Sequence, residues 1–138
     1  MGFDEIVTML SGILVVGFCV FLISLAVVIV ARPSAAERFL MSFASSAPAH
    51  YTEQALRLLV GWAIVNCAGS MWYPNLFSVF GWLVVVTTIG LLLIPWQWHH
   101  KLATLVMPSV IRRMRLFALG AAGLGAFVLY SLSRAVTQ

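Results

Sequence analysis

Three histidines, His50, His99 and His100, are the residues of this chain best suited to chemistry. Imidazole nitrogens bind transition metals and act as general bases near neutral pH, and the carboxylates of Glu37 and Glu53 are potential co-ligands. Adjacent residues on a helix point about a third of a turn apart, so the neighbouring pair of histidines would not converge on one ion. We interpret all three as residues of a membrane interface. We expect no catalytic residue, no metal site and no cofactor.

A cluster of basic residues is the second candidate for function, and it consists of Lys101, Arg112, Arg113 and Arg115. Basic residues beside a membrane segment attract anionic lipid head groups, by about 1 kcal/mol per charge. The same residues also fix the orientation of a membrane protein. The formal charge of +4 does not indicate nucleic-acid binding, because the basic residues flank apolar segments. The cluster therefore predicts a site for lipid or for a membrane partner.

Polar residues inside the apolar segments are few, and Asn66 and Ser70 are the notable ones. An amide in lipid needs a hydrogen-bonding partner on another helix, so we expect both residues to pack inside a bundle or to line a pore. No Asp, Glu, Lys or Arg lies in the middle of an apolar segment, which argues against proton-coupled export. Cys19 and Cys67 lie within such segments, and we interpret them as packing residues.

Apolar segments must position all of these residues, because 62% of the 138 residues are hydrophobic and only 9% are charged. The run from Ile6 to Ala31 contains no charge and exceeds the roughly twenty residues that cross a bilayer. The sequence predicts an all-α polytopic membrane protein in which residues 1–138 form a single transmembrane domain. The four expected spans are residues 6–31, 55–73, 77–95 and 114–133.

Two amphipathic stretches, residues 34–46 and 96–107, separate the spans and are expected to lie in the head-group layer. Prolines flank them: Pro33 and Pro48 surround the first, and Pro95 and Pro108 the second, with Pro108 expected to open the last helix. The chain therefore divides into two hairpin-like halves of the same layout. A duplication and a convergence on a common layout both explain this pattern.

The distribution of Lys and Arg predicts the orientation. Seven basic residues flank the first and third connections, and only Arg134 lies on the other side, with Asp4 and Glu5. We expect four spans with both termini outside and both basic connections in the cytoplasm. The seven are Arg32, Arg38, Arg57, Lys101, Arg112, Arg113 and Arg115.

The run GWLVVVTTIGLLLIPWQWHHKLATLVMPSVIRRMRLFALG, residues 81–120, contains a span that ends in Pro and Trp-x-His, a basic stretch and a further span. This half of the chain resembles small uncharacterised four-span bacterial inner-membrane proteins. The resemblance implies location in a bacterial plasma membrane, and it implies no activity and no site residues.

These observations favour a non-enzymatic accessory or structural membrane protein that binds lipid or a membrane partner through its basic cytoplasmic face. A homo-oligomeric channel or carrier for a small solute is the alternative, motivated by Asn66, Ser70 and the glycines of the spans. A membrane enzyme acting on lipid, with one of the three histidines as base, is a third hypothesis. Membrane lipids and a membrane protein or a second copy are the expected partners.

Overall fold

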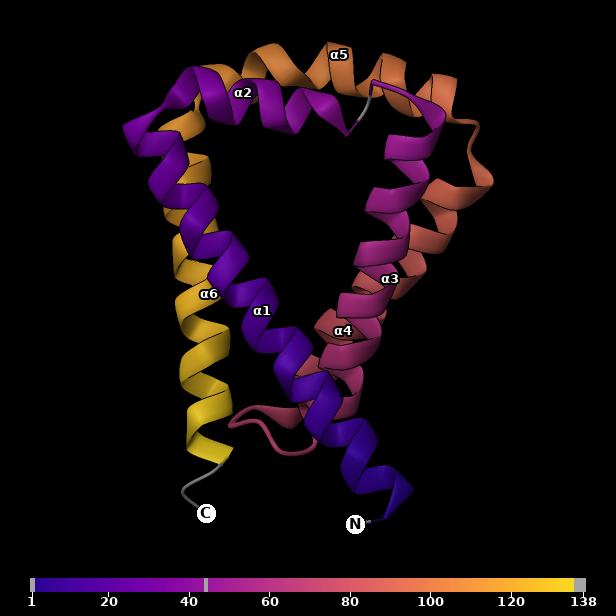
Figure 1. Ribbon diagram of the computed structural model, residues 1–138, viewed down its shortest axis with the longest axis vertical. Helices are drawn as coiled ribbons and strands as arrows, with labels where there is room; N and C mark the ends of the chain where they lie inside the picture. The colour runs from indigo at the N-terminus through magenta and orange to yellow at the C-terminus, as the bar shows by residue number, and fades with distance from the viewer. Residues whose placement is uncertain (1, 44, 136–138) are drawn as a thin grey trace.

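The computed structural model describes residues 2–43 and 45–135, and this part of the chain folds into six α-helices (Figure 1). No strand occurs in it, which confirms the all-α class. The helices in chain order are α1 (Phe3–Ala31), α2 (Pro33–Ser42), α3 (Ala47–Ala68), α4 (Pro74–Leu93), α5 (Trp96–Arg112) and α6 (Met114–Ala135).

Prolines begin several of these helices, because the first turn of a helix does not use the missing N–H group. Pro33, Pro48 and Pro74 occupy the first turns of α2, α3 and α4. The expectation that Pro108 opens the last helix is wrong, since α5 continues through it to Arg112. An interior proline removes one backbone hydrogen bond but leaves both flanks free to stay helical. The chain breaks instead at Arg113, whose φ of −114° and ψ of 24° leave the helical region.

Three helices of the described chain, α1, α4 and α6, are long and apolar enough to cross a membrane. The sequence analysis expected four, and its second span, residues 55–73, is not among the three. Those residues belong largely to α3, which begins earlier and ends at Ala68. The first turns of α3 carry polar and charged side chains that reduce its apolar character, namely His50, Thr52, Glu53, Gln54 and Arg57.

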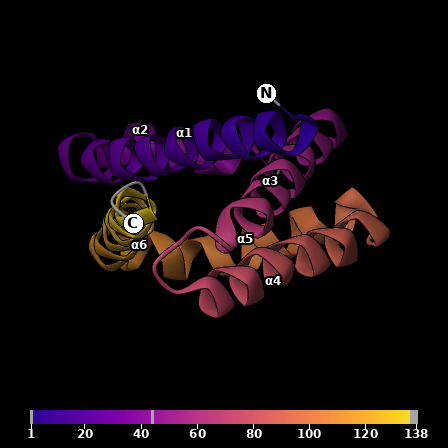
Figure 2. The same ribbon diagram turned by 90° about the horizontal axis from the view of Figure 1, so that it is seen from below.

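The long helices pack in two pairs, α1 along α6 and α3 along α4, with a further contact between α1 and α3. The two pairs meet near the end of the molecule that holds both termini and diverge toward the other end, where α2 and α5 lie across the top (Figure 1). The view from below shows α4 and α6 well apart (Figure 2). The expected hairpin is therefore wrong for the second half, because the 17 residues of α5 separate the ends of α4 and α6 by about 26 Å.

Two apolar clusters hold the helices together. The first lies toward the termini and includes Val15, Cys19, Ile64, Cys67 and Phe77. Both cysteines are free and buried, as expected for packing residues. The second cluster lies toward α2 and joins residues of α1, α2 and α6: Leu25, Ala26, Ile29, Ala36, Met114, Ala118 and Ala121.

Small residues let α6 approach α1 closely. Ala118 and Ala121 are buried in the second cluster, and a Cβ at Gly125 would lie 3.1 Å from the carbonyl oxygen of Cys19. These small residues of α6 therefore serve packing within the protein. Ala126, the residue after Gly125, is exposed.

Candidate functional site

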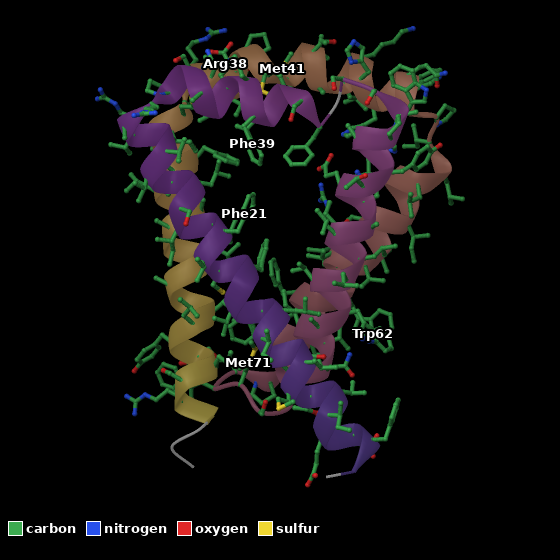
Figure 3. All side chains as sticks on the ribbon, viewed as in Figure 1. Phe21, Arg38, Phe39, Met41, Trp62 and Met71 are labelled. Atoms are coloured by element: carbon green, nitrogen blue, oxygen red, sulfur yellow. The ribbon has the colours of Figure 1, made fainter. Side chains whose placement is uncertain are left out.

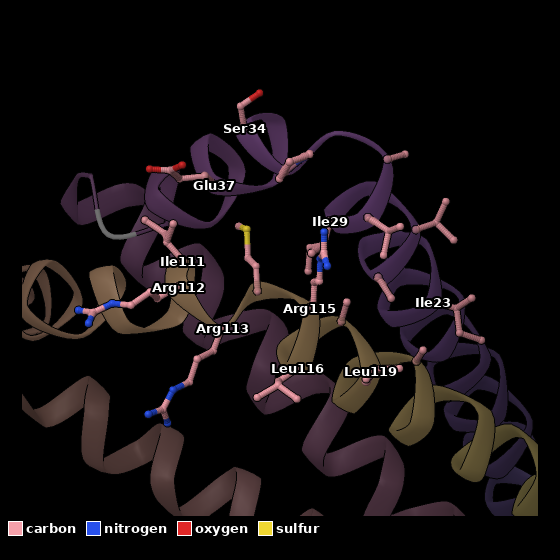
Figure 4. Close-up of a pocket in the computed structure, with 18 residues that line it drawn as sticks. Ile23, Ile29, Ser34, Glu37, Ile111, Arg112, Arg113, Arg115, Leu116 and Leu119 are labelled. Carbon is pink, nitrogen blue, oxygen red and sulfur yellow. The ribbon is translucent and has the colours of Figure 1, made fainter.

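A groove of about 1380 Å³ opens where four helix ends meet (Figure 4). The last turns of α1, the start of α2, the end of α5 and the start of α6 line it. Its walls are mostly apolar, and they include Ile23, Ala26 and Ile29 from α1 and Leu116, Leu119 and Ala122 from α6. Such a groove has room for a flexible hydrocarbon chain.

Two corners of the backbone create the groove. At the first, α1 ends with the backbone N–H of Arg32 donating to the carbonyl of Val28 (N···O 2.7 Å), and Pro33 starts α2 in a new direction. At the second, α5 ends at Arg113 and α6 begins at Met114. Ala36 of α2 is fully buried against α1 and α6 in the second cluster, so the two corners are held next to each other.

Three of the four predicted basic residues, Arg112, Arg113 and Arg115, line this groove and are exposed. Arg112 and Arg113 extend to the left of the view in Figure 4, and Arg115 extends upward. Ser34 and Glu37 of α2 complete the polar part of the rim. Within the described part of the chain, no carboxylate forms an ion pair with these arginines. Three arginines and one glutamate therefore leave the rim with net positive charge.

Lys101, the fourth predicted basic residue, does not line the groove. It lies on α5 with its Nζ 6.0 Å from the ring centroid of Trp98. Eleven positions separate it from Arg112, which corresponds to about 16 Å along a helix. The basic cluster of the sequence is thus divided in space, because a helix extends residues that look close in the sequence.

Asn66 and Ser70 form hydrogen bonds to carbonyls of α3 rather than to another helix of the described chain. The Nδ2 of Asn66 donates to the carbonyl of Trp62 at 2.9 Å, and the hydroxyl of Ser70 donates to the carbonyl of Cys67 at 2.9 Å. Both acceptors lie in α3, where carbonyls three and four residues back are within reach of short polar side chains.

His50 of α3 and His99 of α5 contact each other directly, which the sequence analysis did not foresee. Their Nδ1 atoms are 2.6 Å apart, and only 1% of the surface of His50 is exposed. His100 instead lies beside the ring of Trp96, with ring centroids 6.2 Å apart. Among the described residues, no group of three or more His, Cys, Asp or Glu side chains is arranged to hold a metal ion.

The surroundings of His99 favour its neutral form. Burial lowers the pKa of His99, the carboxylate of Glu53 opposes this, and His50 and Arg57 add to the lowering. Glu53 is itself paired with Arg57, with 3.4 Å between Oε1 and Nη1. The contact between His50 and His99 is therefore a hydrogen bond between two helices in which the neutral form of His99 is favoured.

Gln54 is a further polar residue that the sequence analysis missed. It lies one turn after His50 on the same face of α3 and is fully buried. The Nε2 and Oε1 of Gln54 and the Nε2 of His50 find no hydrogen-bonding partner in the described protein. The sequence did contain a signal, because four positions separate His50 and Gln54. This spacing places both side chains on one face of the helix but does not show that the face is buried.

No family model, curated protein or solved structure matches this chain.

Proposed function

We propose that this protein is a non-enzymatic integral membrane protein that binds an anionic phospholipid in the groove between α1 and α6. The head group contacts the arginines of the rim, and an acyl chain occupies the apolar part. The observation that carries this proposal is the position of Arg112, Arg113 and Arg115 at the mouth of an apolar groove.

The chemistry of the groove fits both ends of such a lipid. Guanidinium groups bind phosphate oxygens through paired N–H donors, and these arginines make no ion pair within the described chain. In the groove, part of an acyl chain would contact apolar side chains and would not meet polar backbone groups. A volume of about 1380 Å³ exceeds the roughly 300–1000 Å³ of common small-molecule pockets, as a lipid requires.

Four crossings of a bacterial plasma membrane, with the basic end in the cytoplasm, are the topology that we propose for this function. Since α2 lies at one end of the molecule and α4 starts near the other, α3 is the segment that connects the two ends (Figure 1). The polar first turns of α3 then lie at the head-group level. The basic residues of α2, α5 and the start of α6 support a cytoplasmic location through the positive-inside rule.

Cysteine labelling tests this topology. Asn75 in the first turn of α4 and Thr104 of α5 are exposed, whereas both native cysteines are buried. In intact cells, an impermeant thiol reagent should label an Asn75→Cys variant and should label Thr104→Cys only after permeabilisation. If both positions react on the same side, α3 does not cross.

Lipid binding is tested by native mass spectrometry of the purified protein with phosphatidylglycerol or phosphatidylcholine. A triple variant, Arg112→Gln, Arg113→Gln and Arg115→Gln, removes the positive charge from the rim of the groove. The control is Arg32→Gln, Arg38→Gln and Lys101→Gln, which removes the same charge from residues outside the groove lining. The rim variant should lose at least about tenfold more affinity for the anionic lipid than the control.

The comparison with phosphatidylcholine, which carries no net charge, shows whether binding depends on the charge of the lipid head group. The native protein should prefer the anionic lipid, and the rim variant should not. Equal losses in the two triple variants would mean that only the overall surface charge attracts lipid, and the groove would then not be the site.

A further inference from the structure

We propose that the contact between His50 and His99 is a proton-sensitive latch, which holds α5 against α3 when the pair is neutral and releases it when both imidazoles are protonated. This inference is independent of lipid binding. It concerns the position of α5 and stands on the geometry of the two rings.

The geometry limits the number of protons that the pair can hold. A hydrogen bond between two Nδ1 atoms needs one N–H donor and one lone pair. The neutral pair satisfies this requirement, and so does a pair with one added proton. A second added proton places an N–H on both Nδ1 atoms, so the hydrogen bond is lost and two positive rings face each other at 2.6 Å.

The groups around the pair do not compensate for a second charge. His50 is buried, and its Nε2 has no partner in the described protein. From α3, Glu53 favours a charge on His99 and Arg57 disfavours it, and these two are paired with each other. The ring of Tyr51 lies against His50, with centroids 5.2 Å apart.

On α5 itself, Lys101 lies two residues after His99 and carries a positive charge. No carboxylate of α5 exists to offset it, because the helix contains no Asp or Glu. The neighbouring helix α2 carries one charge of each sign, Glu37 and Arg38. A positive charge on His99 is therefore not offset by α5 itself.

α5 depends on such contacts because it buries none of its own side chains. Its large apolar residues Trp98, Leu102 and Leu105 are exposed and can contact lipid in more than one position. Arg113 and Pro95 mark sharp changes of backbone direction at its two ends. Its contacts with α2 and α6 are few, so α5 can move as a unit about its two ends when the contact with α3 is lost.

The sign of the pH dependence follows from the two states. Burial lowers the pKa of His99 in the docked state, and solvation on release returns this pKa toward the ordinary value of about 6.5. Docking is therefore fully favourable above about pH 7, and each proton taken up on release weakens it by about tenfold per pH unit as the pH falls below about 6.5.

Hydrogen exchange of the full chain in lipid nanodiscs tests the latch. Amide exchange of α5, corrected for its intrinsic dependence on pH, is followed by mass spectrometry from about pH 8 to about pH 5. Protection of α5 should be constant near neutral pH and should fall by at least about tenfold on acidification. Amides of α1 and α4 should stay protected, which excludes global unfolding.

Two variants prevent the meeting of two charged rings and retain the hydrogen bond, since an Asn amide can replace an imidazole Nδ1 as donor or acceptor. Both His99→Asn and the double variant with His50→Asn should keep α5 protected at low pH. The control, His100→Asn, should release α5 as the native protein does. Unchanged protection of the native α5 across this range, or release of both Asn variants, would overturn the proposal.

Discussion

Gly81 of α4 lies so close to Val65 of α3 that a Cβ at position 81 would be 2.7 Å from the Val65 Cγ2. It would also lie 3.0 Å from the carbonyl oxygen of Gly61. A Cβ at Gly61 would in turn lie 3.0 Å from the Cγ2 of Val85. The two helices therefore pack with their backbones nearly in contact, and two glycines on facing helices make this possible.

Replacing Gly81 by Ala should weaken this packing and lower the free energy of unfolding by about 1–3 kcal/mol, because a methyl group must displace Val65 or the backbone of α3. The control is Gly90→Ala on the same helix, where nothing lies within 4 Å. It should be neutral or stabilising by up to about 1 kcal/mol, since Ala favours a helix more than Gly. Unfolding in mixed micelles measures both, and equal values for the two variants would contradict the close contact.

Ser131 connects α6 to the turn between α3 and α4. Its buried hydroxyl accepts a hydrogen bond from the backbone N–H of Trp72 at 3.0 Å. Ser131→Ala should cost about 1 kcal/mol of stability, because the N–H loses its acceptor. Ser133→Ala is the matched control, since that hydroxyl is exposed and bonds only within α6, to the carbonyl of Tyr130. A cost no larger than that of the control would show that this bond does not stabilise the turn.

Replacing Gln54 should stabilise the protein, in contrast to the two substitutions above. Its buried amide lacks a partner in the described protein, so Gln54→Met, which has a similar volume, should raise the free energy of unfolding by about 1–3 kcal/mol. The measurement is the same unfolding experiment, with Gln97→Met at an exposed site of α5 as control. Destabilisation by the Gln54 change would show that the amide is satisfied in solution.

The charges beside His99 should move its pKa in opposite directions. Glu53→Gln removes the group that raises the pKa, so His99 should protonate at lower pH; Arg57→Gln removes a group that lowers it, so His99 should protonate at higher pH. Titration of the imidazole signals by NMR measures both shifts. Release of α5 should move the opposite way, because a charge on docked His99 becomes less favourable without Glu53 and more favourable without Arg57: Glu53→Gln should release α5 at higher pH and Arg57→Gln at lower pH. Shifts of the same sign would mean that these charges do not act on His99.

The helices could be predicted from apolar runs and prolines, because both act over a few residues. Arg112, Arg113 and Arg115 were predicted as one site for the same reason, since they are neighbours in the sequence. Lys101 was predicted with them but does not line the groove, because the sequence does not show how far a continuous helix carries a residue. The sequence did not reveal that α5 continues to Arg112, because a proline weakens a helix without always ending it.

The contact between His50 and His99 could not be predicted in this way. Forty-nine positions separate them, and their meeting depends on how α5 lies over α3. That arrangement follows from the packing of α3 on α4 and of α6 on α1, which depends on Gly61, Gly81 and Gly125. Glycine in a span is compatible with many helix pairings, so the sequence alone did not select this one.

The divergence of the two helix pairs has a consequence for the bilayer itself. The cross-section is small at the end with the termini and large at the end where α2 and α5 lie flat (Figure 3). In the proposed orientation the protein displaces more area from one leaflet than from the other. Many copies in a small patch would create an area mismatch between the leaflets, and the membrane would relieve it by curving with its convex face on the side of α2 and α5.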